Sequence, residues 1–377
     1  GADQPCCFMQ LWRLLAGLAA ACRAAADGEQ AFDRFRRWLV DSGAEFHVGL
    51  DLGVDPATGL RGLIAREAVA AGGEVFHVPA SVMLTVEAAQ AQGLAWQTCG
   101  AGGHAGGDPA PAFHAPQYTA LALFLLEQRH PGAAWRPWVS LLPESFAGAP
   151  PLYGERDLGE FQASPVRRAI EREQRMVAED HAAAARLVPG LALEDFRWAR
   201  AVVMSRQFNV RFHANGQPLN ESVMMVPLLD LVNHETGPRS KNVEPKFRPG
   251  EGVRFVAVRD ISEGDCLYGN YGSASNWEFL WRWGFTDPQL GPRSVMPFFV
   301  DLADTAGERR GRLAKRDVVA QAREAGAVVT EPDNSTVLHG VTGTFAGFEF
   351  ERLLGHLRFV AFRGEERALK RLCGTTY

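Results

Sequence analysis

The pattern of apolar and polar residues changes character several times along the chain. Apolar residues recur at helical spacing from Phe32 to Val40, and Ser42-Gly43 follows as a stop signal. Between His47 and Leu84, short apolar runs alternate with breaks that contain Gly or Pro, which is typical of a β meander. The runs that predict strands are Val48–Leu50, Gly62–Ala65, Glu74–Val78 and Val82–Leu84.

The middle of the chain, Thr85 to Arg206, predicts mostly helix. Its helical segments are the apolar Tyr118–Gln128, the charged Pro165–Leu187 and Leu193–Arg206. Strand patterns return at Met224–Pro227, Val253–Val258 and Cys266–Tyr268. Because strands flank a long helical segment, we expect an α+β fold of short strands and small sheets with a helical insertion.

The composition changes again after Gly291. Arg309–Ala325 and Phe348–Leu372 have helical spacing, and a polar break lies between them at Glu331–Ser335. We therefore expect a smaller all-helical domain at the end of the chain. The expected organisation is an N-terminal arm (1–31), a strand-rich domain (32–290) with its insert at about 85–206, and an incomplete helical domain (291–377).

Composition narrows the functional classes. The net charge of −5 leaves no basic excess to neutralise phosphates, so nucleic acid is not expected as the main partner. The 46% hydrophobic and 22% charged residues are ordinary for a soluble globular protein. The six cysteines show no C-x-x-C spacing, which argues against a structural zinc ion and fits a reducing compartment.

The N-terminal segment Phe8–Ala26 is apolar, lacks acidic residues, and carries Arg13 and Arg23. It is either the remnant of a targeting peptide or a surface helix that packs on the domain. Its uninterrupted apolar run, Leu14–Cys22, is too short to span a bilayer, and we expect no transmembrane segment.

Two short polar clusters near the end of the strand-rich part carry the candidate chemistry. They are Asp230–His234 and Gly269–Gly272, and neither has the spacing of a metal site or a phosphate loop. Asn233 can both donate and accept, so it suits an amino-acid-like ligand. His234 is more typical of a hydrogen-bonded core residue than of a catalyst. Tyr271 is either a buried aromatic residue or a hydroxyl placed at a reacting group.

Four segments in this order resemble the SET domain of the Rubisco large-subunit methyltransferase group. They are Gly59–Ala65 with Ala71–Val75 and Val78-Pro79, Ser205–Phe208, Pro227–His234, and Glu263–Phe285. The resemblance covers about Phe32 to Leu290. It implies a methyltransferase that uses S-adenosylmethionine, with a helical insert inside the SET domain and a helical substrate-binding domain after it.

The resemblance also implies roles for individual residues. The implied cofactor-binding residues are Arg61, Gly62, Leu63, Arg206, Asp230, Asn233, His234, Tyr271 and Phe285. Arg206 would meet the ligand carboxylate, and Phe285 would pack on the adenine ring. Tyr271 is implied as the catalytic residue, because its hydroxyl can orient the attacking amine. Phe208 and Trp283 are implied to line the substrate channel, and no metal is required.

The chain departs from the family pattern in two places. The family usually carries a second tyrosine about ten residues after the Asn-His pair, whereas Pro238–Glu244 contains none. It also usually has tyrosine where this chain has Trp283. Both departures bear on the substrate and on how many methyl groups are transferred.

The leading hypothesis is a protein-lysine N-methyltransferase that acts on a non-histone protein. A relative in the group that methylates a histidine of actin carries Asn where this chain has Phe208, which favours a lysine acceptor here. A protein-histidine N-methyltransferase and a catalytically weak SET-like binding module are the alternatives. We expect a monomer whose protein substrate docks on the C-terminal helical domain. The chloroplast stroma and the cytoplasm are the expected locations, and the nucleus is a third, because the group has members in all three.

Overall fold

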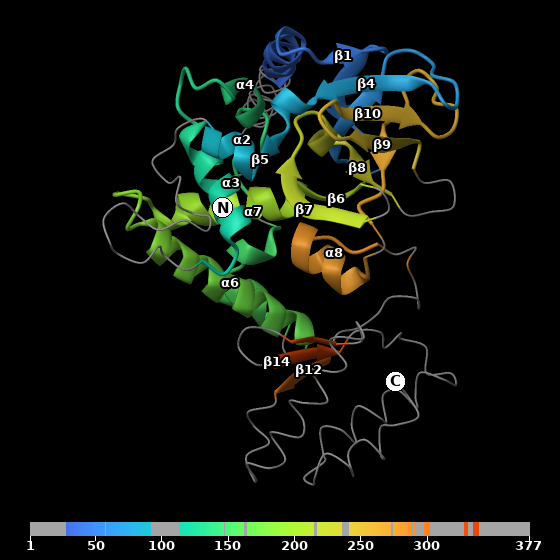
Figure 1. Cartoon of the computed structure of the whole chain (residues 1–377). Helices are drawn as coiled ribbons and strands as arrows, with labels where there is room; N and C mark the ends of the chain where they lie inside the picture. Colours follow the sequence, from blue (N-terminus) through green and yellow to red (C-terminus); the bar gives the residue numbers. More distant parts are fainter. Residues whose placement is uncertain are drawn as a thin grey trace, which may run out of the picture. The chain divides into compact units, whose positions relative to one another are not determined.

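The structure is a computed structural model of the chain (Figure 1). It describes residues 28–56, 58–91, 113–146, 148–161, 164–214, 217–235, 241–272, 274–287, 290, 298–301, 328–330 and 335–338. The chain divides into two compact units, one of Gly1–Phe146 with Met176–Tyr271 and the other of Ala147–Arg175 with Gly272–Tyr377. The N-terminal segment 1–27 lies outside the described residues.

The first unit opens with a helix at residues 28–41 and then forms a four-stranded antiparallel sheet in the order β1-β4-β10-β9. Its strands are β1 (Glu45–Phe46), β4 (Glu74–Pro79), β9 (Val243–Arg248) and β10 (Gly252–Ala257). Phe76 of β4 and Phe255 of β10 are buried and stack with ring centroids 4.8 Å apart, which anchors the sheet to the core. The predicted helix and the predicted strands β4 and β10 are confirmed, whereas β1 and β9 were not predicted.

The helical insert of the first unit packs around two apolar helices. These are α3 (Pro116–Glu127) and α7 (Leu193–Arg206), and both bury most of their length because they are apolar on more than one face. In Figure 1 they lie to one side of the unit, with the four-stranded sheet on the other side. Shorter helices accompany them: α2 (Val86–Ala91) and α4 (Arg136–Val139). The long charged helix α6 (Pro165–Ala184) is divided between the two units.

A buried polar network holds the start of α3. The Ala115 N-cap offers no side-chain oxygen, and Asp180 of α6 accepts from the backbone N–H of His114 at 2.7 Å instead. Arg200 of α7 pairs with the same carboxylate at 2.7 Å, and both side chains are almost fully buried. The network explains how two polar residues are accommodated inside the apolar insert.

A three-stranded antiparallel sheet in the order β5-β7-β6 follows the insert. It consists of β5 (Leu84–Thr85), β6 (Gln207–Ala214) and β7 (Gln217–Met225). The sequence predicted strand only from Met224, so β6 and most of β7 were missed. The Asn215-Gly216 dipeptide between them is a hairpin signal in the sequence.

Two small pairings position the polar clusters. The first is the antiparallel hairpin β2 (Leu50–Val54) and β3 (Arg61–Ala65), in which Gly53 faces Gly62. The second is the parallel pair β8 (Asn233–His234) and β11 (Tyr268–Gly269). The 265–267 segment runs along the free side of β3, where the Leu267 N–H donates to the Leu63 carbonyl at 2.8 Å. The chain thus brings residues far apart in sequence onto one group of short strands.

The second unit contains η2 (Pro150–Leu152), α5 (Glu155–Gly159) and α8 (Asn276–Trp283). Ser275 and Glu278 form a capping box at the start of α8. Gly284 ends the helix with a φ of 79°, and a Cβ there would strike the carbonyl oxygen of Gly148. The position therefore requires glycine on two grounds.

The described residues after Gly291 form a three-stranded antiparallel sheet of β12 (Phe298–Asp301), β14 (Ser335–Leu338) and β13 (Val328–Thr330). The prediction of an all-helical domain was therefore wrong for these residues. They are rich in Val, Thr and Phe, which favour strands, and the predicted polar break lies between β13 and β14. The predicted helices Arg309–Ala325 and Phe348–Leu372 lie outside the described residues.

Candidate functional site

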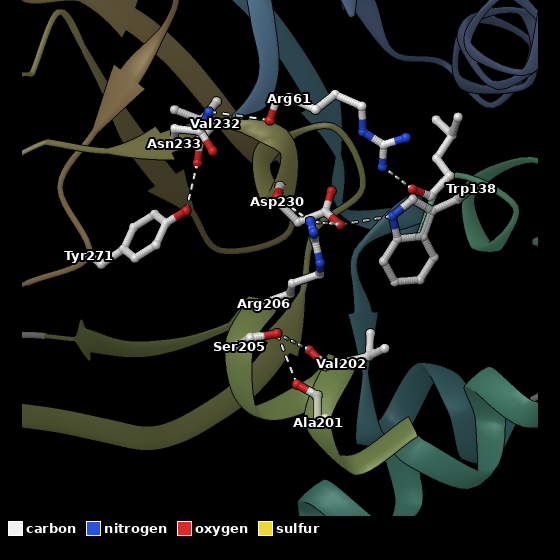
Figure 2. Close-up of polar contacts among 11 residues, drawn as sticks. Arg61, Trp138, Ala201, Val202, Ser205, Arg206, Asp230, Val232, Asn233 and Tyr271 are labelled. Atoms are coloured by element: carbon white, nitrogen blue, oxygen red, sulfur yellow. Dashed lines mark hydrogen bonds and ion pairs between the residues drawn. The ribbon is translucent and has the colours of Figure 1, made fainter. Parts of the chain in front are cut away.

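The first unit brings Gly62 and Asn233 into contact, although 171 positions separate them in the chain numbering. The Asn233 side-chain amide donates to the backbone carbonyl of Arg61 at 3.3 Å (Figure 2). A Cβ at Gly62 would lie 2.6 Å from Asn233 Nδ2, so only glycine leaves room for this approach. Gly62 lies inside β3, as the predicted strand Gly62–Ala65 implies.

A strained turn introduces the Asp230–His234 cluster. Leu228 adopts φ 75° and ψ −47°, a rare conformation for a residue with a branched side chain. Such strain costs about 1–3 kcal/mol and persists where the surroundings enforce it, often at functional sites. The turn leads into the short helix η3 (Leu229–Leu231), which directs Asp230 into the protein interior.

Asp230 is held by two residues of the helical insert. Its side chain is fully buried, and its Oδ2 accepts from the Trp138 indole N–H at 3.2 Å. Arg206, the last residue of α7, donates to the Asp230 backbone carbonyl at 2.6 Å and lies 3.5 Å from the carboxylate (Figure 2). Burial raises the pKa of Asp230, while Arg206 and the Trp138 hydrogen bond oppose that rise.

Two buried polar atoms of this ion pair have no hydrogen-bond partner among the residues the structure describes. They are Asp230 Oδ1, an acceptor, and Arg206 Nε, a donor. Arg61 lies within electrostatic reach of both residues, and desolvation followed by the Arg206 charge lowers the pKa of Arg61. Buried polar groups are normally satisfied, so the two atoms point to a ligand with complementary polar groups.

Tyr271 and His234 form the other half of the site. The Tyr271 hydroxyl donates to the Val232 carbonyl at 3.0 Å, and the Tyr271 backbone N–H donates to His234 Nδ1 at 3.0 Å. The two rings lie 4.9 Å apart, centroid to centroid. Because Nδ1 is an acceptor, a neutral His234 carries its proton on Nε2. The geometry gives His234 an orienting role for Tyr271.

Desolvation raises the pKa of Tyr271 to about 12. Arg206 lowers this pKa and Asp230 raises it, so both charges act on the hydroxyl. Tyr271 therefore stays protonated at physiological pH and acts as a hydroxyl, not as a tyrosinate base.

The remaining predicted site residues fall in two places. Leu63 is buried on β3 beside Gly62, and Phe208 on β6 lies 6.3 Å from the ring of Phe247 on β9. Trp283 and Phe285 belong to the second unit, where both rings pack on Phe279 at 5.4 and 5.2 Å. Their predicted roles in the substrate channel and against the adenine ring stay predictions.

Sequence reasoning missed four residues that support this site. They are Trp138, Asp55, Asn242 and Tyr268, none of which was singled out as a site residue. Asn242 is buried and its side chain contacts the Cys266 carbonyl and the Tyr268 N–H, at 2.7 Å each. A polar residue between two strands gives no sequence signal that separates it from a loop residue, so these contacts required the fold.

The described residues lack two kinds of feature, a cluster of metal ligands and a membrane-spanning helix. No group of three or more His, Cys, Asp or Glu residues in the described part of the chain is placed to hold a metal ion. Within that same part, no helix is long and apolar enough to cross a membrane.

Comparison with known proteins agrees with the fold. No protein-family model matches the chain. The N-lysine methyltransferase SETD6 of Mus musculus is 26% identical over 275 residues, covering 67% of this chain and 54% of that protein. An actin-histidine N-methyltransferase of Xenopus tropicalis is 24% identical over 345 residues, covering 87% of this chain and 56% of the relative. The chain thus spans just over half the length of these curated relatives.

Solved structures extend the likeness to three dimensions. The crystal structure of the SET domain of LSMT bound to lysine and AdoHcy matches with a TM-score of 0.66 at 19% identity. The match covers 92% of this chain and 74% of that one. The α+β fold of small sheets with a helical insertion is confirmed. The chain therefore has the fold of the LSMT SET domain and is similar in sequence to SETD6 and to actin-histidine N-methyltransferases.

Proposed function

We propose that the chain is an S-adenosylmethionine-dependent protein-lysine N-methyltransferase. The observation that carries the proposal is the convergence of Gly62, Arg206 and Tyr271 on the Asp230–His234 segment, which contains Asn233, in a SET fold. The SETD6 relatives are lysine methyltransferases by name, and LSMT neighbours hold AdoMet or AdoHcy by description.

The unsatisfied polar atoms fit the cofactor. The amino-acid portion of S-adenosylmethionine carries one carboxylate and one ammonium group. A ligand carboxylate would satisfy Arg206 Nε, and a ligand ammonium group would satisfy Asp230 Oδ1. Asn233, which can donate and accept, and the Arg61–Leu63 backbone would hold the rest of that portion. The residues present therefore suit a zwitterionic ligand.

When bound, S-adenosylmethionine supplies a methyl group activated by the sulfonium charge. The chain's own contribution is to position a neutral amine and to exclude water. The Tyr271 hydroxyl donates its proton to the Val232 carbonyl at 3.0 Å, so toward a substrate its oxygen can act only as an acceptor. That oxygen can accept an N–H of the incoming amine and thereby direct the amine lone pair toward the methyl group.

None of the residues described above is assigned to remove the proton of the substrate ammonium group. Tyr271 is already protonated, with a pKa of about 12, and His234 Nδ1 is engaged by the Tyr271 backbone. The amine would therefore lose its proton to solvent before it enters the site. The rate should follow the fraction of deprotonated lysine, whose ordinary pKa is about 10.4.

Phe208 supports lysine over histidine as the acceptor. It places an aromatic ring against Phe247 where an amide would offer hydrogen bonds to an imidazole. An aromatic wall suits the aliphatic stem of lysine. Histidine methylation remains the second candidate, because relatives named as actin-histidine methyltransferases cover up to 87% of this chain.

We further propose that the substrate is a protein. The proposed location of the chain is the chloroplast stroma, the cytoplasm or the nucleus.

Cofactor binding and transfer can be tested separately. Calorimetric titration with S-adenosylmethionine should show one site per chain, and thermal unfolding should shift upward with cofactor concentration. A filter assay with radiolabelled cofactor should then show labelled protein in a lysate. Binding without transfer would support the binding-module alternative, and absence of binding would refute the proposal.

A further inference from the structure

The tip of the β2–β3 hairpin is held by polar contacts and not by apolar burial. Val54 and Leu60, the large apolar residues that flank the turn, are 63% and 56% exposed. Asp55 between them is only 2% exposed, so a carboxylate is the most buried group of the tip. A buried carboxylate is costly unless it is hydrogen-bonded, and its partners therefore determine where the tip lies.

Asp55 closes its own turn and also reaches across the fold. Its backbone N–H donates to the Leu60 carbonyl and its carbonyl accepts from Gly59, at 2.8 Å each. Its Oδ2 accepts from the Thr58 hydroxyl at 2.6 Å, and the Tyr268 hydroxyl of β11 donates to the same oxygen. The Tyr268 contact joins residues 213 positions apart.

The backbone of Tyr268 is held by Asn242. Its backbone N–H donates to the Asn242 side chain at 2.7 Å, and its carbonyl accepts from the Asn242 N–H at 3.0 Å. Burial and the neighbouring Asp55 raise the pKa of Tyr268, so the hydroxyl keeps its proton as a donor. The tip of the hairpin is thereby held against β11.

The same strand also bears on the proposed cofactor site. Tyr268 pairs in register with Asn233, and Asn233 in turn contacts the Arg61 carbonyl at the other end of the turn. These contacts form a closed ring that runs from Asp55 through the turn to Arg61, then to Asn233, to Tyr268 and back to Asp55. The contact between Asp55 and Tyr268 therefore helps to set the distance between the Arg61–Gly62 backbone and the Asn233 amide.

We propose that Tyr268 and Asp55 are positioning residues for the cofactor site, because their contact sets the Arg61–Gly62 backbone against Asn233. The inference rests on the proposed function, since the site is the one assigned to S-adenosylmethionine. Neither residue needs to touch the ligand or the reacting atoms. Their loss should weaken cofactor binding and leave transfer at saturating cofactor nearly unchanged.

The test compares Tyr268→Phe with the wild-type chain in two measurements. Calorimetry should show about tenfold weaker S-adenosylmethionine binding, because hydrogen bonds to a charged group are among the stronger ones. At saturating cofactor, kcat should stay within about twofold. Hydrogen–deuterium exchange without ligand should show faster exchange in residues 58–62 and no change in β4 or β10.

Two further variants serve as a control for the loss of a tyrosine hydroxyl and as an alternative way to weaken the Asp55 contacts. Tyr153→Phe is the matched control, since Tyr153 also donates its hydroxyl to a single acceptor, the Gly148 carbonyl at 3.2 Å, in the other unit. It should change neither measurement. Thr58→Ala removes the other hydroxyl donor to Asp55 at an exposed position and should weaken binding about threefold. It keeps the proposal testable if Tyr268→Phe fails to fold.

The outcomes separate this inference from the proposed function. Unchanged exchange at residues 58–62 overturns the positioning role whatever the ligand. Faster exchange with unchanged cofactor affinity also overturns it, because the tip would then move without affecting the site. If the wild-type chain shows no cofactor binding, the proposed function fails and the role of the pair in that site falls with it.

Discussion

Gly62→Ala is the substitution that tests the geometry of the site most locally. Gly62 does not have a positive φ, so alanine is compatible with its backbone and the effect of the change is steric. The added Cβ would lie 2.6 Å from Asn233 Nδ2 and 3.4 Å from its Cγ. Because β3 is paired on both sides, through β2 and through the Leu267–Leu63 hydrogen bond, the Asn233 amide is the group that must move.

The magnitude follows from two contributions. The Asn233 amide must withdraw by roughly 1 Å to reach ordinary van der Waals contact, which breaks its hydrogen bond to the Arg61 carbonyl. Losing that bond costs about 0.5–1.5 kcal/mol, and overpacking a tight position costs about 1–3 kcal/mol before relaxation. Since the amide can partly rotate away, we expect a net loss of about 1–2 kcal/mol in cofactor binding. This corresponds to roughly 5- to 30-fold weaker affinity.

Calorimetric titration of S-adenosylmethionine measures this loss directly, with thermal unfolding as a check on folding. Gly53→Ala is the matched control, because Gly53 faces Gly62 in the same hairpin. Its added Cβ would meet the terminal methyl of Ile64, which can rotate aside, and it would not touch Asn233. If Gly62→Ala binds the cofactor as tightly as wild type, or if both variants lose affinity equally, Gly62 and Asn233 do not form the cofactor site.

Four further predictions concern the rest of the site and the chain. Tyr271→Phe should lower kcat by at least tenfold and change cofactor affinity by only a few fold, as separated by steady-state kinetics and calorimetry; an equal loss in both would make Tyr271 a binding or packing residue. The pKa of Tyr271 is raised from 10.0 to about 12, so protonated Tyr271 contributes stability below pH 10 that is lost as the pH rises toward 12. Ultraviolet titration should accordingly give the same tyrosinate signal below pH 11 for the native protein and for Tyr271→Phe. A step near pH 10 that is present in the native protein and absent from the variant would contradict the desolvated environment. Trp138→Phe leaves the Asp230 carboxylate with one donor fewer and should lower the free energy of unfolding by about 1–3 kcal/mol in denaturant titration, whereas an unchanged value would show that the indole contact is dispensable. A chain truncated near Leu290 should still bind S-adenosylmethionine if folded but methylate an intact protein substrate poorly compared with a short peptide; full activity on the intact protein would exclude a docking role for the tail.

The elements that could be predicted from the sequence are those with a strong local signal. The helix Leu193–Arg206 was predicted with the bounds that α7 has, because its apolar residues recur with helical spacing and the strand β6 follows directly. The strands β3, β4 and β10 were predicted within two residues, since Gly and Pro mark their ends.

The elements that were missed depend on tertiary context. β6 (Gln207–Ala214) mixes polar and apolar residues, and β1 has only two residues, so neither gives a clear period. The described strands after Gly291 were assigned to a helical domain because neighbouring segments have helical spacing. Short strands in a small sheet are defined by their partners more than by their own composition.

The candidate site shows the same division. Asn233, His234 and Tyr271 stand out because their motif resembles a known family, and the fold places them beside Gly62 and Arg206. Trp138, Asp55 and Tyr268 have no motif of their own. They act through hydrogen bonds that span 92 or 213 positions, and no local pattern encodes such a pairing.

The central claim is that the chain transfers a methyl group from S-adenosylmethionine to a lysine of a protein. The most direct measurement uses cofactor labelled with a deuterated methyl group, a lysate of the organism that encodes the chain, and mass spectrometry of the modified peptides. The claim predicts deuterated methyl groups on the side-chain nitrogen of lysine, present with the wild-type chain and greatly reduced with Tyr271→Phe. Label on histidine instead of lysine, or equal labelling with and without the wild-type chain, would contradict it.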